Sequence, residues 1–152
     1  MPEQWFLKVD GIAGESTAAR HAKEIDVESW SFGASAGLPG AGSGAGSGRP
    51  TLDPFVVETR MSVATPALLR ACVTGTHIRG ATLTGTRSGG RGMDVVTYAM
   101  SDVLVTSARH GDTAAGAPFD RFTLGFRTLT ITYRPQAPNG AAGPAISVTI
   151  TS

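Results

Sequence analysis

The chain has 152 residues, which is the size of one domain with a hydrophobic core of its own. Hydrophobic residues make up 41% and charged residues 16%, and the formal net charge is +1, so bulk charge favours neither a nucleic-acid nor a membrane partner. Cys72 is the only cysteine, which excludes a disulfide within the chain. Glu3 and Lys8 interrupt the start, where a signal peptide needs an apolar run, and no stretch reaches the ~18 apolar residues of a membrane-spanning helix. We therefore expect a protein that folds in the cytoplasm and that, if it is exported, leaves without a cleavable signal peptide.

Two strands are predicted near the start of the chain, at Trp5–Ile12 and Ile25–Phe32. The apolar positions of the first strand alternate regularly. In the second strand they change phase, from Ile25 and Val27 to Trp30, which indicates a bulge or a strand buried on both faces. The polar, charged segment between the two strands is interpreted as a connection.

Residues 34–50 are predicted to form a flexible loop. Glycine occupies every second position from Gly40 to Gly48, and such a segment has little apolar surface to bury. A phosphate-binding loop is disfavoured, because neither the G-x-G-x-x-G spacing nor a following Gly-Lys-Ser/Thr is present.

A strand at Phe55–Val63 and a helix at Pro66–Thr74 are predicted next. Thr65 is suited to the N-cap and Pro66 to the first helical position, while Gly75 is suited to a left-handed exit from the helix. The apolar stripe that should face the core is formed by Leu68, Leu69, Cys72 and Val73.

The rest of the chain is predicted to be strands joined by glycine-rich or proline-rich turns. The expected strands are Ile78–Arg87, Met93–Ala108, Phe122–Arg134 and Ile146–Ile150, with a hairpin turn at Ser88–Gly92, a loop at Gly111–Pro118 and a C-terminal extension over 137–152. Both long strands change phase, as the second strand of the chain does, which is typical of strands that bend around a barrel or pass between packed surfaces. The sequence therefore predicts a single domain over 1–152, mainly β: a small two-sheet antiparallel β-barrel with one flanking α-helix.

No constellation of side chains predicts an enzyme, a metal site or a cofactor. The three histidines, His21, His77 and His110, have no metal-ligand neighbours at short spacing, and His21 is expected to pack within the polar connection. Cys72 is expected to be a core thiol because it lies on the apolar stripe, and no G-x-S-x-G motif occurs. Trp5 and Trp30 are interpreted as core residues.

Several blocks of the sequence follow one family pattern. The matching blocks are FLKVDGI at Phe6–Ile12, GEST at Gly14–Thr17, His21, EIDV at Glu24–Val27, SWSFG at Ser29–Gly33, SVATPALLRACVTGTHIRGATL at Ser62–Leu83, SDVLVTSAR at Ser101–Arg109, and Leu124–Gln136. In this combination the chain resembles the haemolysin-coregulated protein (Hcp) family, the ring-forming tube subunits of bacterial type VI secretion. The resemblance implies that six copies close into a ring and that rings stack into a hollow tube, which a contractile sheath expels. It also implies that the lumen carries small effector proteins and that the subunit is exported.

The expected partners are therefore further copies of the chain, sheath and spike proteins, and small effector proteins, without nucleic acid or membrane insertion. Arg49 and Asp53 are candidates for contacts between stacked rings, although the Gly/Ala/Ser stretch replaces a better-formed loop of the family. Candidate lumen-facing residues are Ser29, Ser31, Thr82 and Thr84, because they are small or polar and lie away from the predicted core. The C-terminal strand is expected to complete the barrel or to extend a neighbour's sheet. Alternative interpretations are a stand-alone ring or barrel that binds or chaperones partner proteins, a phage-like tail-tube protein and, ranked last, an enzyme.

Overall fold

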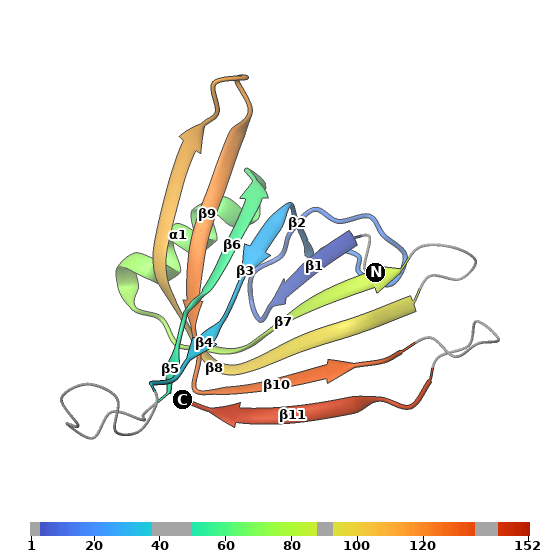
Figure 1. The fold of residues 1–152 in the computed structure, drawn as a ribbon. Helices are drawn as coiled ribbons and strands as arrows, with labels where there is room; N and C mark the ends of the chain where they lie inside the picture. The colour runs from blue at the N-terminus through green and yellow to red at the C-terminus, as the bar shows by residue number, and fades with distance from the viewer. Residues whose placement is uncertain (1–3, 38–49, 88–92, 136–142) are drawn as a thin grey trace.

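The computed structural model describes residues 4–37, 50–87, 93–135 and 143–152, and these residues form eleven strands and one helix (Figure 1). The helix is α1, at Ala64–Thr74. The strands are β1 Gln4–Val9, β2 Ile25–Val27, β3 Ser29–Ser31, β4 Ala34–Ser35, β5 Thr51–Leu52, β6 Phe55–Arg60, β7 Ile78–Arg87, β8 Met93–Asp112, β9 Pro118–Gly125, β10 Thr128–Tyr133 and β11 Ile146–Thr151.

Two antiparallel sheets share the long strand β8. The large sheet has the order β2-β1-β7-β8-β10-β11, and the small sheet has the order β3-β6-β9-β8. The first part of β8 pairs with β7 and β10, whereas Leu104–Asp112 pairs with β9. The pairing of β8 with β10 ends at Ser101 and its pairing with β7 at Val103; Asp102, between these two residues, has φ +56°, a conformation that aspartate tolerates better than most residues. Figure 1 shows the two sheets diverging from this strand.

The predicted changes of phase mark the points where the chain passes from one sheet to the other. In the segment Ile25–Phe32, β2 belongs to the large sheet and β3 to the small sheet, with Glu28 between them. The prediction of one strand over Phe122–Arg134 is wrong, because β9 ends in the small sheet at Gly125 and β10 begins in the large sheet at Thr128. The alternation of apolar residues therefore indicates where the chain crosses between the sheets, but it does not distinguish one bent strand from two separate strands.

The mainly β, antiparallel architecture with one helix is confirmed, but the closed barrel is wrong for the described residues. Within them, β2 pairs only with β1, and β3 pairs only with β6. These two strands end the two sheets although only Glu28 separates them in sequence. The Glu28 N–H donates a hydrogen bond of 2.9 Å to the Glu58 carbonyl oxygen of β6. At this junction the two sheets are therefore connected by the continuous chain and this hydrogen bond, and not by pairing between β2 and β3.

Helix α1 begins two residues before the predicted start. Thr65 is not its N-cap: the cap position is Val63, which makes no side-chain cap bond, and the Thr65 hydroxyl instead accepts the Ser62 N–H at 3.0 Å. The predicted left-handed exit is confirmed at Gly75, with φ +64°. The buried face consists of Ala64, Thr65, Leu68 and Ala71, whereas Leu69 and Val73, both assigned to the apolar stripe, are 40% and 77% exposed. The predicted stripe is therefore confirmed at Leu68 and at Cys72, which packs against the core, and is wrong at Leu69 and Val73.

The core lies between the diverging sheets and under α1. Its largest fully buried side chains include Phe55, Phe122 and Leu7. Both tryptophans pack against it, as predicted: Trp5 and Trp30 have ring centroids 4.8 Å apart in an edge arrangement. Cys72 is half-buried and packs against the same core, in agreement with a structural thiol.

The loops and the terminal strand differ in part from the prediction. The loop predicted at Gly111–Pro118 is shorter, because Gly111 pairs with Phe119 and the turn spans Thr113–Ala117. The turn predicted at 88–92 lies outside the described residues. The predicted terminal strand is present as β11, which pairs with β10 along its whole length and becomes the edge of the large sheet.

Removing residues 137–152 is expected to lower the melting temperature only slightly. The deletion removes six paired positions between β10 and β11, but Ile146 and Val148 are 65% and 55% exposed, so β11 takes little apolar surface out of water. We expect a loss of about 1 kcal/mol, which lowers the melting temperature by about 2–4 °C for a domain of this size. Thermal unfolding followed by circular dichroism measures the change. An unchanged melting temperature would mean that β11 does not stabilise the domain.

Candidate functional site

One face of the small sheet is left uncovered by the described chain. The opposite face carries Phe55, Val57 and Phe122, which are fully buried in the core. Successive side chains along a strand point to opposite sides of a sheet, so the residues that alternate with these lie on the other side. They are exposed or half-buried, and we call them the small-sheet face: Ser29, Ser31, Val56, Glu58, Arg60, Arg109, Phe119, Arg121 and Thr123.

The cross-strand register arranges the small-sheet face in rows. The charged row runs through Ser29, Glu58, Arg121 and Arg109, each opposite the next across β3, β6, β9 and β8. Directly opposite residues of antiparallel strands have their side chains on the same side, within contact distance. The neighbouring row is uncharged and runs through Ser31, Val56, Thr123 and Ser107.

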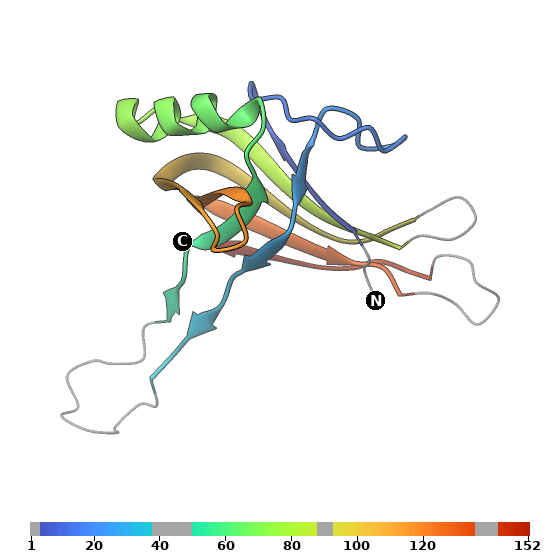
Figure 2. The same cartoon turned by 90° about the horizontal axis from the view of Figure 1, so that it is seen from above.

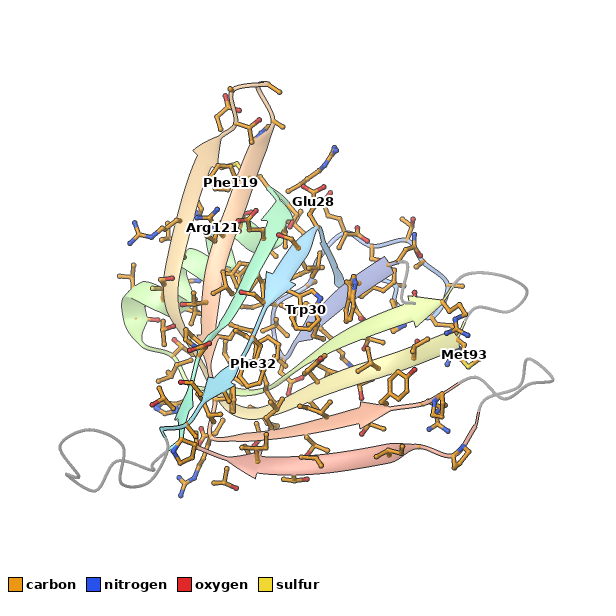
Figure 3. The ribbon with its side chains drawn as sticks, viewed as in Figure 1. Glu28, Trp30, Phe32, Met93, Phe119 and Arg121 are labelled. Carbon is orange, nitrogen blue, oxygen red and sulfur yellow. The ribbon has the colours of Figure 1, made fainter. Side chains whose placement is uncertain are left out.

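Ion pairs connect part of the charged row. The Arg121 Nε donates to Glu58 Oε2 at 2.7 Å, and the Arg60 Nε lies 3.7 Å from Glu28 Oε2. The Arg121 guanidinium also lies 5.9 Å from the centre of the Phe119 ring, a cation–π distance. Figure 3 shows Phe119 and Arg121 together on β9, with Glu28 at the neighbouring end of β3.

The four predicted lumen residues do not share one surface. Ser29 and Ser31 are exposed on the small-sheet face. Thr82 and Thr84 lie on β7 in the large sheet, and the Thr84 residue is 4% exposed. Whether any of them lines a lumen remains a prediction, and only the two serines enter the proposal made below.

The two predicted ring-stacking residues are also separated. Arg49 lies outside the described residues. Asp53 is exposed directly after β5, where its N–H donates to the Gly33 carbonyl oxygen at 2.9 Å. Because β4 pairs with β5, the ends of the predicted loop over 34–50 form a two-stranded ribbon that points away from both sheets (Figure 2).

A buried histidine fixes the polar connection between β1 and β2. The His21 side chain is 9% exposed, with Nδ1 2.9 Å from Glu24 Oε1 and Nε2 2.9 Å from Asp94 Oδ1. Its ring stacks on Phe6 at 4.7 Å. Burial lowers the pKa of His21, but the hydrogen bonds to Asp94 and Glu24 and the charges of these carboxylates outweigh it, so the pKa is raised above the ordinary value. We call this arrangement the histidine bridge, and it confirms that His21 packs within the connection.

The remaining histidines and carboxylates form pairs but no catalytic or metal constellation that the described residues reveal. His77 Nδ1 lies 3.2 Å from Asp102 Oδ1 at an exposed position. His110 Nε2 lies 3.8 Å from Asp120 Oδ1, and burial raises the pKa of Asp120, opposed by the nearby Thr65 hydroxyl and the charge of His110. Among the described residues, no group of three or more His, Cys, Asp or Glu side chains is placed to hold a metal ion. No helix in residues 4–37, 50–87, 93–135 or 143–152 has the length and apolarity needed to cross a bilayer.

The charged row was not predicted from the sequence, although one signal was available. Arg109 and Arg121 are equally distant from the centre of the turn at Thr113–Ala117, so a hairpin around that turn places them opposite each other. Glu58 had no such signal, since β6 reaches β9 from a distant part of the chain.

Known proteins resemble this chain in sequence and in fold. A family model described as "Type VI secretion system effector, Hcp" matches residues 6–133. Protein hcp1 of Pseudomonas aeruginosa is 32% identical over 144 residues, which cover 93% of this chain and 89% of that protein. The solved structure of a type six secretion system protein has a TM-score of 0.86 at 25% identity, covering 97% of this chain and 94% of its own. Hcp1 from Salmonella typhimurium has a TM-score of 0.79 at 25% identity, covering 99% and 95%.

Proposed function

This chain belongs to the Hcp family of type VI secretion proteins, and on that premise we propose that it is the repeating subunit of a hollow ring. The ring contains six copies, and rings stack into the inner tube of a contractile injection system. The lumen carries small effector proteins, and the subunit leaves the cell with the tube, without a cleavable signal peptide. The role is structural, with no catalytic step assigned to the chain.

The small sheet supports ring closure because both of its edges are free. Among the described residues, β3 pairs only with β6, and Leu104–Asp112 of β8 pairs only with β9. Free strand edges expose unpaired N–H and carbonyl groups, which favour pairing with another chain. Since the strands alternate in direction, the β3 edge of one copy meets the β8 edge of the next as an antiparallel neighbour. Repeated head-to-tail contacts of this kind close into a ring.

The uncovered face supports one side of the small sheet as the lining of the proposed lumen. The other side of the small sheet is filled by the core, so the small-sheet face with Ser29 and Ser31 is the one available to turn inward. Six copies of four strands give a barrel of about 24 strands, wider than the 16–18-stranded porins that already enclose water. Such a lumen is polar and is wide enough for a small folded protein.

Stacking of rings is assigned to the β4–β5 ribbon. It points away from both sheets in Figure 2, and Asp53 lies at its base. We propose that the segment it carries, including Arg49, contacts the next ring. The glycine-rich composition of that segment predicts weak stacking, because each contact must offset the entropy of ordering it.

The proposal is tested by measuring the mass of the purified protein by light scattering and imaging the same fraction by electron microscopy. We expect a particle of six times the 15.6 kDa chain, or multiples of it, with a central pore. A monomer at micromolar concentration would contradict ring formation. Separate rings without stacks would instead favour a stand-alone carrier.

Hydrogen exchange identifies the edges that close the ring. In the assembled fraction, compared with a diluted monomer fraction, the amides of β3 and Leu104–Asp112 are expected to exchange more slowly. The edge strands of the large sheet, β2 and β11, serve as the comparison. If only these became protected, closure would occur through the large sheet, and the lumen assignment would be wrong.

A further inference from the structure

We infer that the small-sheet face binds carboxylate-rich surfaces of the protein cargo. The inference rests on the proposed function, in which this face lines the lumen, and it adds the chemistry of the partner. It follows from the charges on the face and from which of them are already neutralised.

The small-sheet face has one cation more than the carboxylates can neutralise. Arg60 lies beside Glu28, and Arg121 is hydrogen-bonded to Glu58. Arg109 is exposed, and none of the described carboxylates forms an ion pair with it. A single copy therefore presents one unneutralised guanidinium on this face, and because every neighbour in the ring brings the same charges, closure leaves the excess of one cation per subunit unchanged.

The position of Arg109 makes an added carboxylate favourable. It is directly opposite Arg121, and like charges at such a position repel each other. Glu58 is hydrogen-bonded to Arg121, and it lies on β6, on the far side of β9 from Arg109. A guanidinium binds a carboxylate through two parallel hydrogen bonds, so an acidic side chain of a partner supplies the missing charge. In the proposed ring the site recurs in every subunit, which raises the avidity for a partner with several acidic side chains.

The uncharged row provides the second element of recognition. The Thr123 hydroxyl lies within hydrogen-bonding distance of the hydroxyls of Thr106 and Ser107, the latter at 2.9 Å, and Ser31 and Val56 continue the row. Hydroxyls both donate and accept hydrogen bonds and therefore fit many polar protein surfaces. Such contacts, made in the presence of water, are suited to a cargo that has to be released.

Nucleic acid fits this face less well than protein. A phosphate backbone requires a continuous basic track, and Glu28 and Glu58 interrupt the arginines here. A folded protein with scattered carboxylates and hydrogen-bonding groups matches the mixture of charges.

Fluorescence anisotropy with labelled peptides tests the inference. The assembled protein is titrated into a hepta-glutamate peptide and into a Gly-Ser peptide of the same length, at low and at high salt. We expect tighter binding of the glutamate peptide, lost at high salt, and a decrease of about fivefold to tenfold in Arg109→Ala. Arg79→Ala is the matched control, because Arg79 is exposed on β7, outside the small sheet, and its removal should leave binding unchanged.

The outcomes separate the inference from the proposed function. Equal binding of the two peptides, or an equal decrease in both variants, would overturn the inference even if rings form. Tighter binding of a labelled oligothymidine than of the glutamate peptide would also overturn it. Light scattering on the same samples reports ring formation, so a failure of the proposed ring is recognised independently. The Arg109→Lys variant retains the charge and should retain part of the binding, which controls for misfolding.

Discussion

Replacing Gly14 by alanine is expected to lower the free energy of unfolding by about 3 kcal/mol, the upper end of the cost of overpacking. A Cβ at this position would lie 2.5 Å from the Glu24 carbonyl oxygen and 2.7 Å from the Ile25 Cα. Both are backbone atoms next to or within β2, so a side-chain rotation cannot relieve the clash. The Gly14 N–H also donates to the Lys23 carbonyl oxygen at 2.7 Å, which fixes this close approach. Urea unfolding followed by tryptophan fluorescence measures the effect, because Trp5 and Trp30 pack against the core.

Gly11→Ala and Gly116→Ala are matched controls for this prediction. Both glycines have positive φ, +82° and +81°, but a Cβ at either position would meet nothing within 4 Å. Their replacement costs only the strain of a left-handed conformation, about 1–2 kcal/mol. If Gly14→Ala were no more destabilising than these variants, the close packing of the connection against β2 would be wrong.

The path of the chain between the sheets was predictable because burial imposes alternation. Where the chain passes from one sheet to the other, the alternation of apolar and polar residues changes phase. Ile25–Phe32 shows this change where β2 ends and β3 begins. Whether the two sheets close into a barrel was not predictable in the same way, and the predicted closure is wrong. Closure depends on hydrogen bonds between the distant strands at the ends of the two sheets, and alternation within a strand carries no information about them.

The buried face of α1 was predicted only in part, for a related reason. Periodicity selected the large apolar side chains, and Leu68 and Cys72 do pack against the core, but the small Ala64 and Ala71 complete the contact in place of Leu69 and Val73. Small side chains allow the helix to approach the body of the protein closely.

The candidate surface was predictable only in part. Ser29 and Ser31 were predicted because they are small, polar and away from the predicted core, and they lie on the small-sheet face. The charged row depends on the register between β6, β9 and β8, which joins Glu58 to Arg121 and Arg109 across the sheet. Such rows are set by tertiary pairing, so the chemistry of the proposed lumen emerges only from the structure.

Replacing His21 by alanine is expected to lower the free energy of unfolding by about 3 kcal/mol at pH 6. The variant loses the stack on Phe6 and both hydrogen bonds of the histidine bridge, and it leaves Glu24 and Asp94 without their shared partner. His21→Phe retains an aromatic ring for the stack but removes the charge, so it separates packing from electrostatics. His77→Ala is the control, because the His77 side chain is 72% exposed and should contribute little.

The histidine bridge also predicts how stability depends on pH. The carboxylates raise the pKa of His21 in the folded protein above its ordinary value of 6.5, so the folded state binds the proton more tightly than the unfolded state. The stabilisation is therefore fully present below pH 6.5 and is lost as the pH rises through the folded pKa. We expect the free energy of unfolding to fall over this range in the wild type, less steeply in Asp94→Asn, and without the histidine contribution in His21→Phe. Equal pH profiles for the wild type and His21→Phe would show that folding leaves the pKa of His21 unchanged, and a wild-type stability that instead rises with pH would show that the folded state holds the imidazole neutral; either result would contradict the prediction.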